Sequence, residues 1–145
     1  MGEVPSPNME DYLERMYRLI EQKGFARVVD IADALDIRPS SVTHMLQRLD
    51  DKGYVSYEKY RGVTLTDTGR QIGRDMVERH RDLTRLLRIL GVSDEDIIFE
   101  DVEGIEHHLS KQSMERIRRF VGFVIDNPGW WRRYTDETHD DSGAT

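Results

Sequence analysis

The segment DVEGIEHHLS, residues 101–110, combines two glutamates and two histidines in a chain that contains no cysteine. If the segment is helical, Glu103, Glu106 and His107 stand at i, i+3 and i+4 and share one face of the helix. Carboxylate oxygen and imidazole nitrogen suit a hard to borderline cation such as Mn²⁺, with Fe²⁺, Co²⁺, Zn²⁺ and Cd²⁺ as competitors. A solvated acidic helix face has the same spacing, so the segment indicates either a metal site or an acidic surface.

Ligands from a single helix leave coordination positions open, so other segments have to supply the remainder. Asp11 and Glu14 form an i, i+3 pair on the first predicted helix, away from its apolar stripe. His80 lies beside the apolar face of a long predicted helix. Together these residues make an oxygen-rich set with two imidazoles, large enough for two ions bridged by carboxylates. His108 is turned by about 100° from His107, so we do not expect both histidines on one ion.

The charge of the chain is unevenly distributed along it. The formal net charge is −7, but Arg27–Arg74 holds eight basic and seven acidic residues, a net charge of +1. The range Asp94–Glu106 holds seven acidic residues and no basic one. Such a cluster repels itself unless a cation or solvent relieves it. The acidity is therefore local and does not exclude a nucleic-acid-binding segment elsewhere.

Length and composition indicate a small protein without a membrane-spanning segment. A chain of 145 residues suits one domain, or a small domain joined to an oligomerisation segment. No apolar run approaches the roughly 18 residues of a membrane span, and the N-terminus lacks a secretion signal. The absence of cysteine excludes disulfides and thiolate ligands and is compatible with a reducing compartment. We expect a cytoplasmic protein with no membrane partner.

Apolar periodicity predicts the elements that must position these residues. Helices are expected over residues 9–23, 28–35 and 40–52, from about 68 to 90, around 97–101, over 102–109, and over 114–124. Two β-prone runs, 54–59 and 63–67, are separated by Tyr60–Gly62 and predict a hairpin. Thr66 is expected to cap the long helix and Gly91 to end it. The order helix, helix, turn, helix, hairpin predicts a mainly α fold with an N-terminal winged helix-turn-helix.

The polar face of the predicted helix over residues 40–52 is suited to DNA. Val42, Met45, Leu46 and Leu49 would face inward, leaving short hydroxyls and longer Gln and Arg side chains outside. Such side chains contact phosphates and base edges, and the cations of the hairpin tip would neutralise phosphates. The candidate DNA-binding residues are Arg38, Pro39, Ser40, Ser41, Thr43, His44, Gln47, Arg48, Lys59 and Arg61. We expect Tyr57 and Tyr60 to pack within the hairpin, and a protein-binding trihelical domain remains an alternative.

Three segments resemble the DtxR/MntR family of metal-dependent transcriptional repressors, and within it the branch of manganese transport regulators. They are MEDYLERMY, RVVDIADALDIRPSSVTHMLQRLDDKGYVSYEKYRGVTLTDTG and DVEGIEHHLS, and the similarity covers roughly residues 8–125. The resemblance implies a homodimer with one winged helix-turn-helix per chain, followed by an all-α dimerisation domain. It places the metal cluster at the junction between the DNA-binding and dimerisation parts.

The resemblance also implies a ligand set: Asp11, Glu14, His80, Glu103, Glu106 and His107. In the family's binuclear arrangement, Glu14 and Glu106 would bridge two Mn²⁺ ions, with Asp11 and His80 on one ion and His107 on the other. Glu103 would bind through its carboxylate and its main-chain carbonyl. Iron-responsive relatives carry Met and Cys where this chain has Asp11 and Glu103, and these harder oxygen ligands favour Mn²⁺.

The chain is therefore divided into three expected regions: a winged helix-turn-helix DNA-binding domain over residues 1–70, a helical metal-binding and dimerisation domain over 71–126, and a polar, partly disordered tail over 127–145. The SH3-like third domain of the longer iron regulators is not expected. Within the tail, Trp130 and Trp131 are expected to form a small packing patch.

The expected function is that of a manganese-responsive repressor, in which Mn²⁺ promotes binding of the dimer to operator DNA of manganese-uptake genes. Two alternatives remain open. A metalloenzyme could use bridged carboxylates to activate water, although no further residue stands out as a general base or nucleophile. A metal-independent winged-helix regulator could instead sense an organic ligand, and DVEGIEHHLS would then be an acidic surface.

Overall fold

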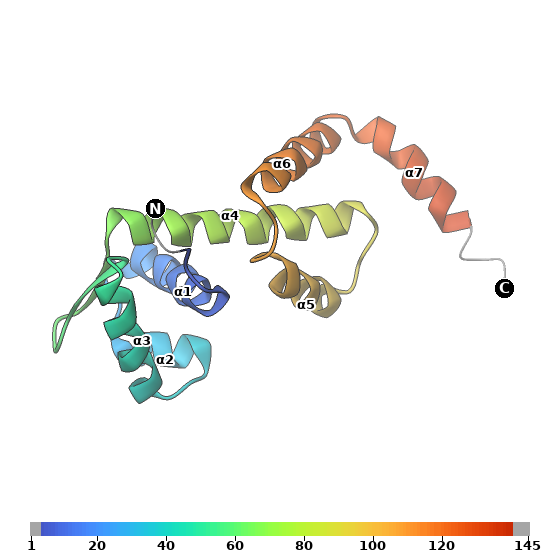
Figure 1. The fold of residues 1–145 in the computed structure, drawn as a ribbon. Coiled ribbons are helices and arrows are strands. Elements are labelled where there is room, and N and C mark those ends of the chain that lie inside the picture. Colours follow the sequence, from blue (N-terminus) through green and yellow to red (C-terminus); the bar gives the residue numbers. More distant parts are fainter. Residues whose placement is uncertain (1–3, 141–145) are drawn as a thin grey trace. The chain divides into compact units, whose positions relative to one another are not determined.

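The computed structural model describes residues 4–140, with the backbone alone for residues 138–140. The chain divides between Val77 and Glu78 into two compact units. Figure 1 labels the helices in chain order. Among the helices that the structure describes, none combines the length and the apolar character required to span a membrane.

Three helices open the first unit, as the sequence predicts. They are α1 (Pro7–Lys23), α2 (Val28–Leu35) and α3 (Pro39–Asp51). The hydroxyl of Ser6 accepts a hydrogen bond from the Met9 amide at 3.3 Å and caps the start of α1. Proline stands in the first turn of both α1 and α3, where its missing N–H costs nothing. With these local interactions α1 begins two residues, and α3 one residue, before the predicted starts at residues 9 and 40.

A two-stranded antiparallel hairpin follows α3 and forms the wing. Its strands, β1 (Val55–Glu58) and β2 (Gly62–Leu65), pair Val55 with Leu65 and Glu58 with Gly62. Residue Ala26, between α1 and α2, forms an isolated bridge with Val63 of β2. The wing is therefore fastened to the body of the first unit on one side.

The core of the first unit is built from the predicted apolar faces. Leu13 and Met16 of α1 are fully buried, as are Val42, Leu46 and Leu49 of α3. Tyr57 of the wing packs against this cluster at partial burial, as expected. One glutamate on α1, Glu14, is also buried, although the sequence placed it on the polar side of the helix.

The long helix α4 (Asp67–Ile89) begins in the first unit and ends in the second. The Thr66 hydroxyl accepts a hydrogen bond from the Gly69 amide at 3.2 Å, so the predicted cap is confirmed. A side chain at Gly69 would overlap the carbonyl oxygen of Tyr54, so the start of α4 packs directly on the chain that enters the wing. At the other end Gly91, with φ of 101°, ends the helix as expected.

The second unit consists of the remainder of α4 with α5 (Glu95–Ile105), α6 (Lys111–Asp126) and α7 (Pro128–Asp140). Leu83, Ile98, Val102 and Met114 form its buried core. The sequence predicted two short helices in the region of α5, but α5 is a single helix. It runs without a break because no residue between Ile97 and Val102 disfavours helix.

The tail differs from its expected disorder, because residues 128–140 are helical and the end of the expected tail, residues 141–145, lies outside the described range. Pro128 occupies the first position of α7, so it starts this helix rather than only ending α6. The expected packing patch is present. The Trp131 ring meets Phe120 edge to face at 5.9 Å, and Trp130 meets Phe123 at 5.6 Å.

Candidate metal centre and DNA-binding surface

Two of the predicted metal ligands lie in the turn that follows α5 rather than inside a helix. The helix ends at Ile105, and residues 106–108 form a turn. Glu106 still has helical dihedral angles, and its amide donates to the Val102 carbonyl at 2.9 Å. The backbone tightens next, where the His108 amide donates to the Ile105 carbonyl at 3.0 Å. Glu103 and Glu106 therefore keep the one-turn spacing that the sequence predicted, although the helix is shorter.

His80 of α4 and two glutamates of α5 and its turn come together within the second unit. The His80 Nδ1 atom lies 3.1 Å from Glu106 Oε2 and 3.6 Å from Glu103 Oε1. One donor atom from each of the three residues lies within 4.8 Å of the others. Two carboxylates and one imidazole are a donor set that Mn²⁺ and neighbouring divalent ions accept. The structure thus brings His80 close to the two glutamates, which stand more than 20 positions further along the chain.

The carboxylate of Glu106 is the most unusual group of this cluster. Its side chain is fully buried, and its Oε1 atom accepts no hydrogen bond from any described residue. The Nε2 atom of His107, on a side chain that is 6% exposed, lies 3.6 Å from this oxygen. A buried carboxylate with an unsatisfied oxygen is unfavourable unless a cation compensates it. The group therefore fits a metal ligand better than a structural carboxylate.

An arginine that the sequence analysis did not identify holds the turn in place. The Arg79 guanidinium donates hydrogen bonds to the carbonyl oxygens of Glu106 and Leu109, at 3.0 Å and 2.6 Å. These carbonyls follow the C-terminus of α5, where helical partners are missing. The available signal was its position beside His80, but a single arginine on a charged helix does not indicate a role. His108, the histidine expected not to share an ion with His107, is exposed.

The other two predicted ligands, Asp11 and Glu14, lie on α1 in the first unit. They are one turn apart, as expected, with Asp11 half-buried. The Glu14 side chain is 10% exposed and forms an ion pair with Arg18, Nη2 to Oε1 3.2 Å. Both carboxylates remain candidate ligands.

The acidic residues at the start of α5 have structural roles that separate them from the cluster at its end. The Asp94 carboxylate caps the helix by accepting hydrogen bonds from the amides of Asp96 and Ile97. Glu95 forms two hydrogen bonds with the Arg88 guanidinium, at 2.8 Å and 3.1 Å. These hydrogen bonds lower the pKa of the Glu95 carboxyl. The acidic run is therefore two features, a capped helix start and the carboxylates near His80.

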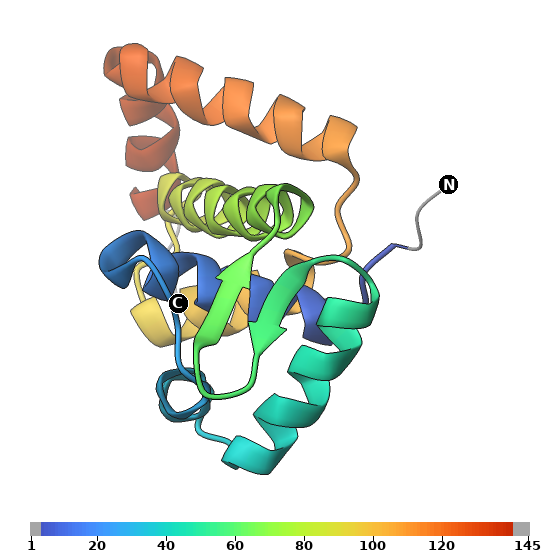
Figure 2. The same ribbon diagram turned by 90° about the vertical axis from the view of Figure 1, so that its left-hand side faces the viewer.

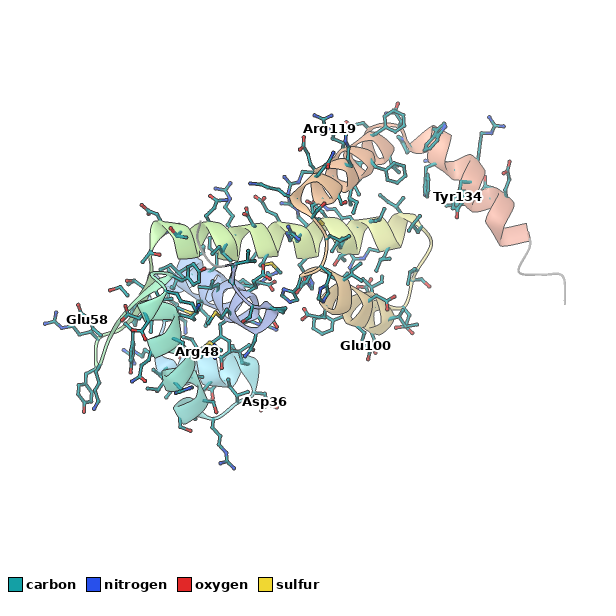
Figure 3. The ribbon with its side chains drawn as sticks, viewed as in Figure 1. Asp36, Arg48, Glu58, Glu100, Arg119 and Tyr134 are labelled. Atoms are coloured by element: carbon teal, nitrogen blue, oxygen red, sulfur yellow. The ribbon has the colours of Figure 1, made fainter. Side chains whose placement is uncertain are left out.

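The polar face of α3 is exposed as the sequence predicted. The exposed candidates on and before this helix are Arg38, Pro39, Ser40, Ser41, His44, Gln47 and Arg48. Thr43 is half-buried, and its hydroxyl donates to the Pro39 carbonyl at 3.1 Å, so this side chain is engaged by the helix itself. Figure 3 labels Arg48 on α3 and Glu58 on the wing, and the side chains of the wing project from the first unit.

The tip of the wing carries the two predicted cations. Lys59 and Arg61 are exposed, and Arg61 makes a long 3.5 Å contact with Glu58. The packing role expected for Tyr60 is wrong, because this side chain is 93% exposed. The residue lies at the turn, beyond the paired part of the strands, where no core is within reach.

Comparisons with known proteins agree with both parts of this description. The family model "Iron dependent repressor, N-terminal DNA binding domain" matches residues 6–63, and "Iron dependent repressor, metal binding and dimerisation domain" matches residues 66–129. The HTH-type transcriptional regulator MntR of Bacillus subtilis (strain 168) is 57% identical over 124 residues, which are 86% of this chain and 87% of that protein. The regulator of the same name from Lysinibacillus sphaericus is 54% identical over 125 residues, 86% of this chain and 89% of that protein.

Solved structures of manganese regulators are also similar to this chain. The structure of the manganese regulator SloR matches with a TM-score of 0.70 and 28% identity, over 82% of this chain and 55% of that chain. A manganese-dependent transcriptional repressor in complex with manganese matches with a TM-score of 0.69 and 28% identity, over 79% of this chain and 53% of that chain. This chain thus spans about half the length of those solved chains. It belongs to the DtxR/MntR family of metal-dependent transcriptional repressors, whose members are regulators rather than enzymes.

Proposed function

We propose that this protein is a manganese-responsive repressor whose dimer binds operator DNA of manganese-uptake genes when Mn²⁺ is bound. The observation that supports this most strongly is the buried Glu106 carboxylate, which faces His80 at 3.1 Å and keeps one oxygen without a hydrogen bond from the described residues. An oxygen-rich donor set without sulfur favours Mn²⁺ over softer ions, and relatives named as manganese regulators support the same choice.

The proposed ligands are the three residues gathered in the second unit, together with His107 and the two carboxylates of α1. The family resemblance implies that these six side chains would hold two ions per chain, with Glu14 and Glu106 shared between the ions. Asp11 and His80 would then bind one ion and His107 the other, with Glu103 contributing an oxygen. Bound Mn²⁺ supplies positive charge that compensates four carboxylates and joins ligands of the DNA-binding and dimerisation parts.

The residues themselves supply the switch in this proposal. Without compensation, the carboxylates of Glu103 and Glu106 repel each other and those of α1, which disfavours bringing the ligands together. When the ligands are held together, the two recognition helices of the dimer are restricted to a spacing close to one helical turn of DNA, about 34 Å. Metal binding and DNA binding then strengthen each other reciprocally, with a coupling of typically 1–3 kcal/mol.

The test is recovery of sheared genomic DNA by the purified full chain with Mn²⁺, with Mg²⁺ and with chelator, at one salt concentration. We expect a few fragments to be enriched with Mn²⁺ alone, and we expect Glu106→Ala to lose this enrichment while His108→Ala, an exposed histidine of the same segment, retains it. Equal enrichment in chelator would contradict metal control. A Glu106→Ala variant that requires the same Mn²⁺ concentration as the wild type would contradict the ligand assignment.

A further inference from the structure

Tyr60, at the tip of the wing, is the most exposed large side chain among the bulky hydrophobic residues that the structure describes, at 93%. A single exposed apolar residue is common on protein surfaces and needs no explanation by itself. The backbone at this residue is what makes Tyr60 unusual.

Tyr60 occupies a turn position that normally belongs to another residue type. The Arg61 amide donates to the Glu58 carbonyl at 3.0 Å, which closes a four-residue turn with Lys59 and Tyr60 in its centre. Tyr60 has a φ of 74°, and glycine or asparagine is favoured at the third position of turns with this geometry. A tyrosine there is disfavoured by the backbone and gains no burial, so turn formation does not account for its identity.

The wing that carries Tyr60 is firmly anchored. The amide of Val63 donates to the Ala26 carbonyl at 2.8 Å, and the amide of Ala26 donates back to Val63 at 3.2 Å. At Gly62 a side chain would come within 2.9 Å of the Ala26 carbonyl, so the strand approaches this segment closely. The tip is thus presented on a stiff support, which lowers the entropic cost of any contact that it makes.

The residues around the Tyr60 ring are suited to binding a polyanion that has apolar surfaces between its charged groups. The Lys59 ammonium lies 5.3 Å from the centre of the Tyr60 ring, and the side chain of Arg61, the next residue, is 82% exposed. Duplex DNA has this combination, because sugars and base edges line a minor groove between two rows of phosphates. In Figure 2 the wing tip and the N-terminal half of α3 both lie toward the lower end of the first unit, and in Figure 1 the wing tip projects to the left of α3.

We propose that Tyr60 is a DNA-contacting residue whose ring enters the minor groove next to the major-groove site of α3, with Lys59 and Arg61 on the flanking phosphates. This inference rests on the proposed DNA-binding function and adds a contact to it. It also accounts for the turn, since the cost of the left-handed tyrosine is offset when DNA is bound.

The test compares Tyr60→Asn and Tyr60→Phe with the wild type on a genomic fragment that the wild type retains with Mn²⁺. Asparagine tolerates the left-handed conformation, so we expect Tyr60→Asn to unfold at the wild-type temperature or above. We expect its affinity for the fragment to fall about ten-fold, with the salt dependence unchanged because both cations remain. Hydroxyl radicals attack DNA sugars through the minor groove, and protection beside the α3 sites should disappear in this variant. Tyr60→Phe should stay within about two-fold of the wild type, because the ring is retained.

Several outcomes would overturn the inference while leaving the proposed function intact. Tyr60→Asn could bind the fragment with wild-type affinity and footprint, or Tyr60→Phe could be as weak as Tyr60→Asn. The second result would contradict a role of the ring. The three proteins are also compared in chelator, on any fragment that the wild type retains under that condition. A contact made by the wing does not depend on the metal ligands, so the effect of Tyr60→Asn should be seen there too. If the wild type retained no fragment under either condition, the proposed function and this inference would fail together.

Discussion

At the scale of single residues, two buried carboxylates of the second unit differ in the side chains that contact them. Asp82 is 2% exposed, and its oxygens accept from the guanidinium groups of Arg118 at 2.9 Å and Arg81 at 3.4 Å. Glu106 is fully buried but faces imidazoles instead of guanidinium groups. A guanidinium group is always charged and stabilises a buried carboxylate without an added ion, whereas an imidazole can itself bind a metal ion beside the carboxylate. This contrast separates the candidate site from ordinary buried charge.

Glu103, a member of the proposed ligand set, should control which metal activates the protein. We expect Glu103→Cys to lower the concentrations of Zn²⁺ and Cd²⁺ needed for half-maximal DNA retention relative to that of Mn²⁺, because thiolate prefers softer ions. A shift of about ten-fold in the ratio is expected, which corresponds to ~1.4 kcal/mol of differential binding. The matched control is Glu100→Cys, an exposed acidic position of the same helix that Figure 3 labels. An unchanged ratio would remove Glu103 from the set.

Residue types and helix spacing were sufficient to name Glu103, Glu106 and His80 as candidate ligands, but only the family resemblance implied that they belong to one cluster. The role of Arg79 could not be predicted in the same way. Its hydrogen bonds join carbonyls 27 and 30 positions further along the chain, and long flexible side chains have no preferred partner in sequence. The packing role expected for Tyr60 was wrong although the sequence placed this residue in the turn, because its ring is exposed there.

At the scale of elements, the turn after α5 depends on α4. Since Arg79 binds both the Glu106 and the Leu109 carbonyl, it fixes the backbone that carries Glu106 and His107. Helix ends without such partners fray, and a frayed end would spread the ligand positions. The adjacent positions of Arg79 and His80 allow one turn of α4 both to hold the α5 turn and to present a candidate ligand.

Replacement of Arg79 should therefore weaken metal binding without removing a ligand. We expect Arg79→Ala to lower Mn²⁺ affinity about ten-fold, the usual effect of residues that orient ligands. Its free energy of unfolding without metal should fall by about 1.5–3 kcal/mol, because two charge-assisted hydrogen bonds are lost. A Mn²⁺ titration followed by electron paramagnetic resonance measures the first quantity, and chemical denaturation measures the second. Arg85→Ala, at an exposed position of the same helix, is the control, and equal Mn²⁺ affinity in the two variants would contradict the orienting role.

Capping and helix-ending residues in the sequence located most helices, but they did not predict whether neighbouring segments form one continuous helix. Thr66 and Gly91 mark helix ends with chemistry that acts over a few residues, so these ends were predictable. The unbroken α5 and the helical residues 128–140 depend instead on packing. The rings of Trp130 and Trp131 stabilise α7 by contacting aromatic residues of α6, and polar composition alone could not reveal this.

At the scale of the whole molecule, metal binding should stabilise the folded chain by mass action. At a free Mn²⁺ concentration 100 times the dissociation constant, a single site adds about 2.7 kcal/mol to the free energy of unfolding. We expect the unfolding temperature of the wild type to rise with added Mn²⁺ and to fall again with chelator. Glu106→Gln keeps the volume of the side chain but removes its charge, and its unfolding temperature should respond weakly. A wild-type response to Mn²⁺ that Glu106→Gln reproduced in full would place the ion elsewhere.

The aromatic patch of α7 has a practical consequence. The chain contains two tryptophans, Trp130 and Trp131, and both belong to the second unit. The Trp131 indole N–H donates to the Ile89 carbonyl at 2.7 Å, at the C-terminal end of α4. Five of the six tyrosines lie in the first unit. Tryptophan emission therefore reports the environment of the second unit alone, so its unfolding can be followed optically, without a label, while the DNA-binding unit contributes only tyrosine signal.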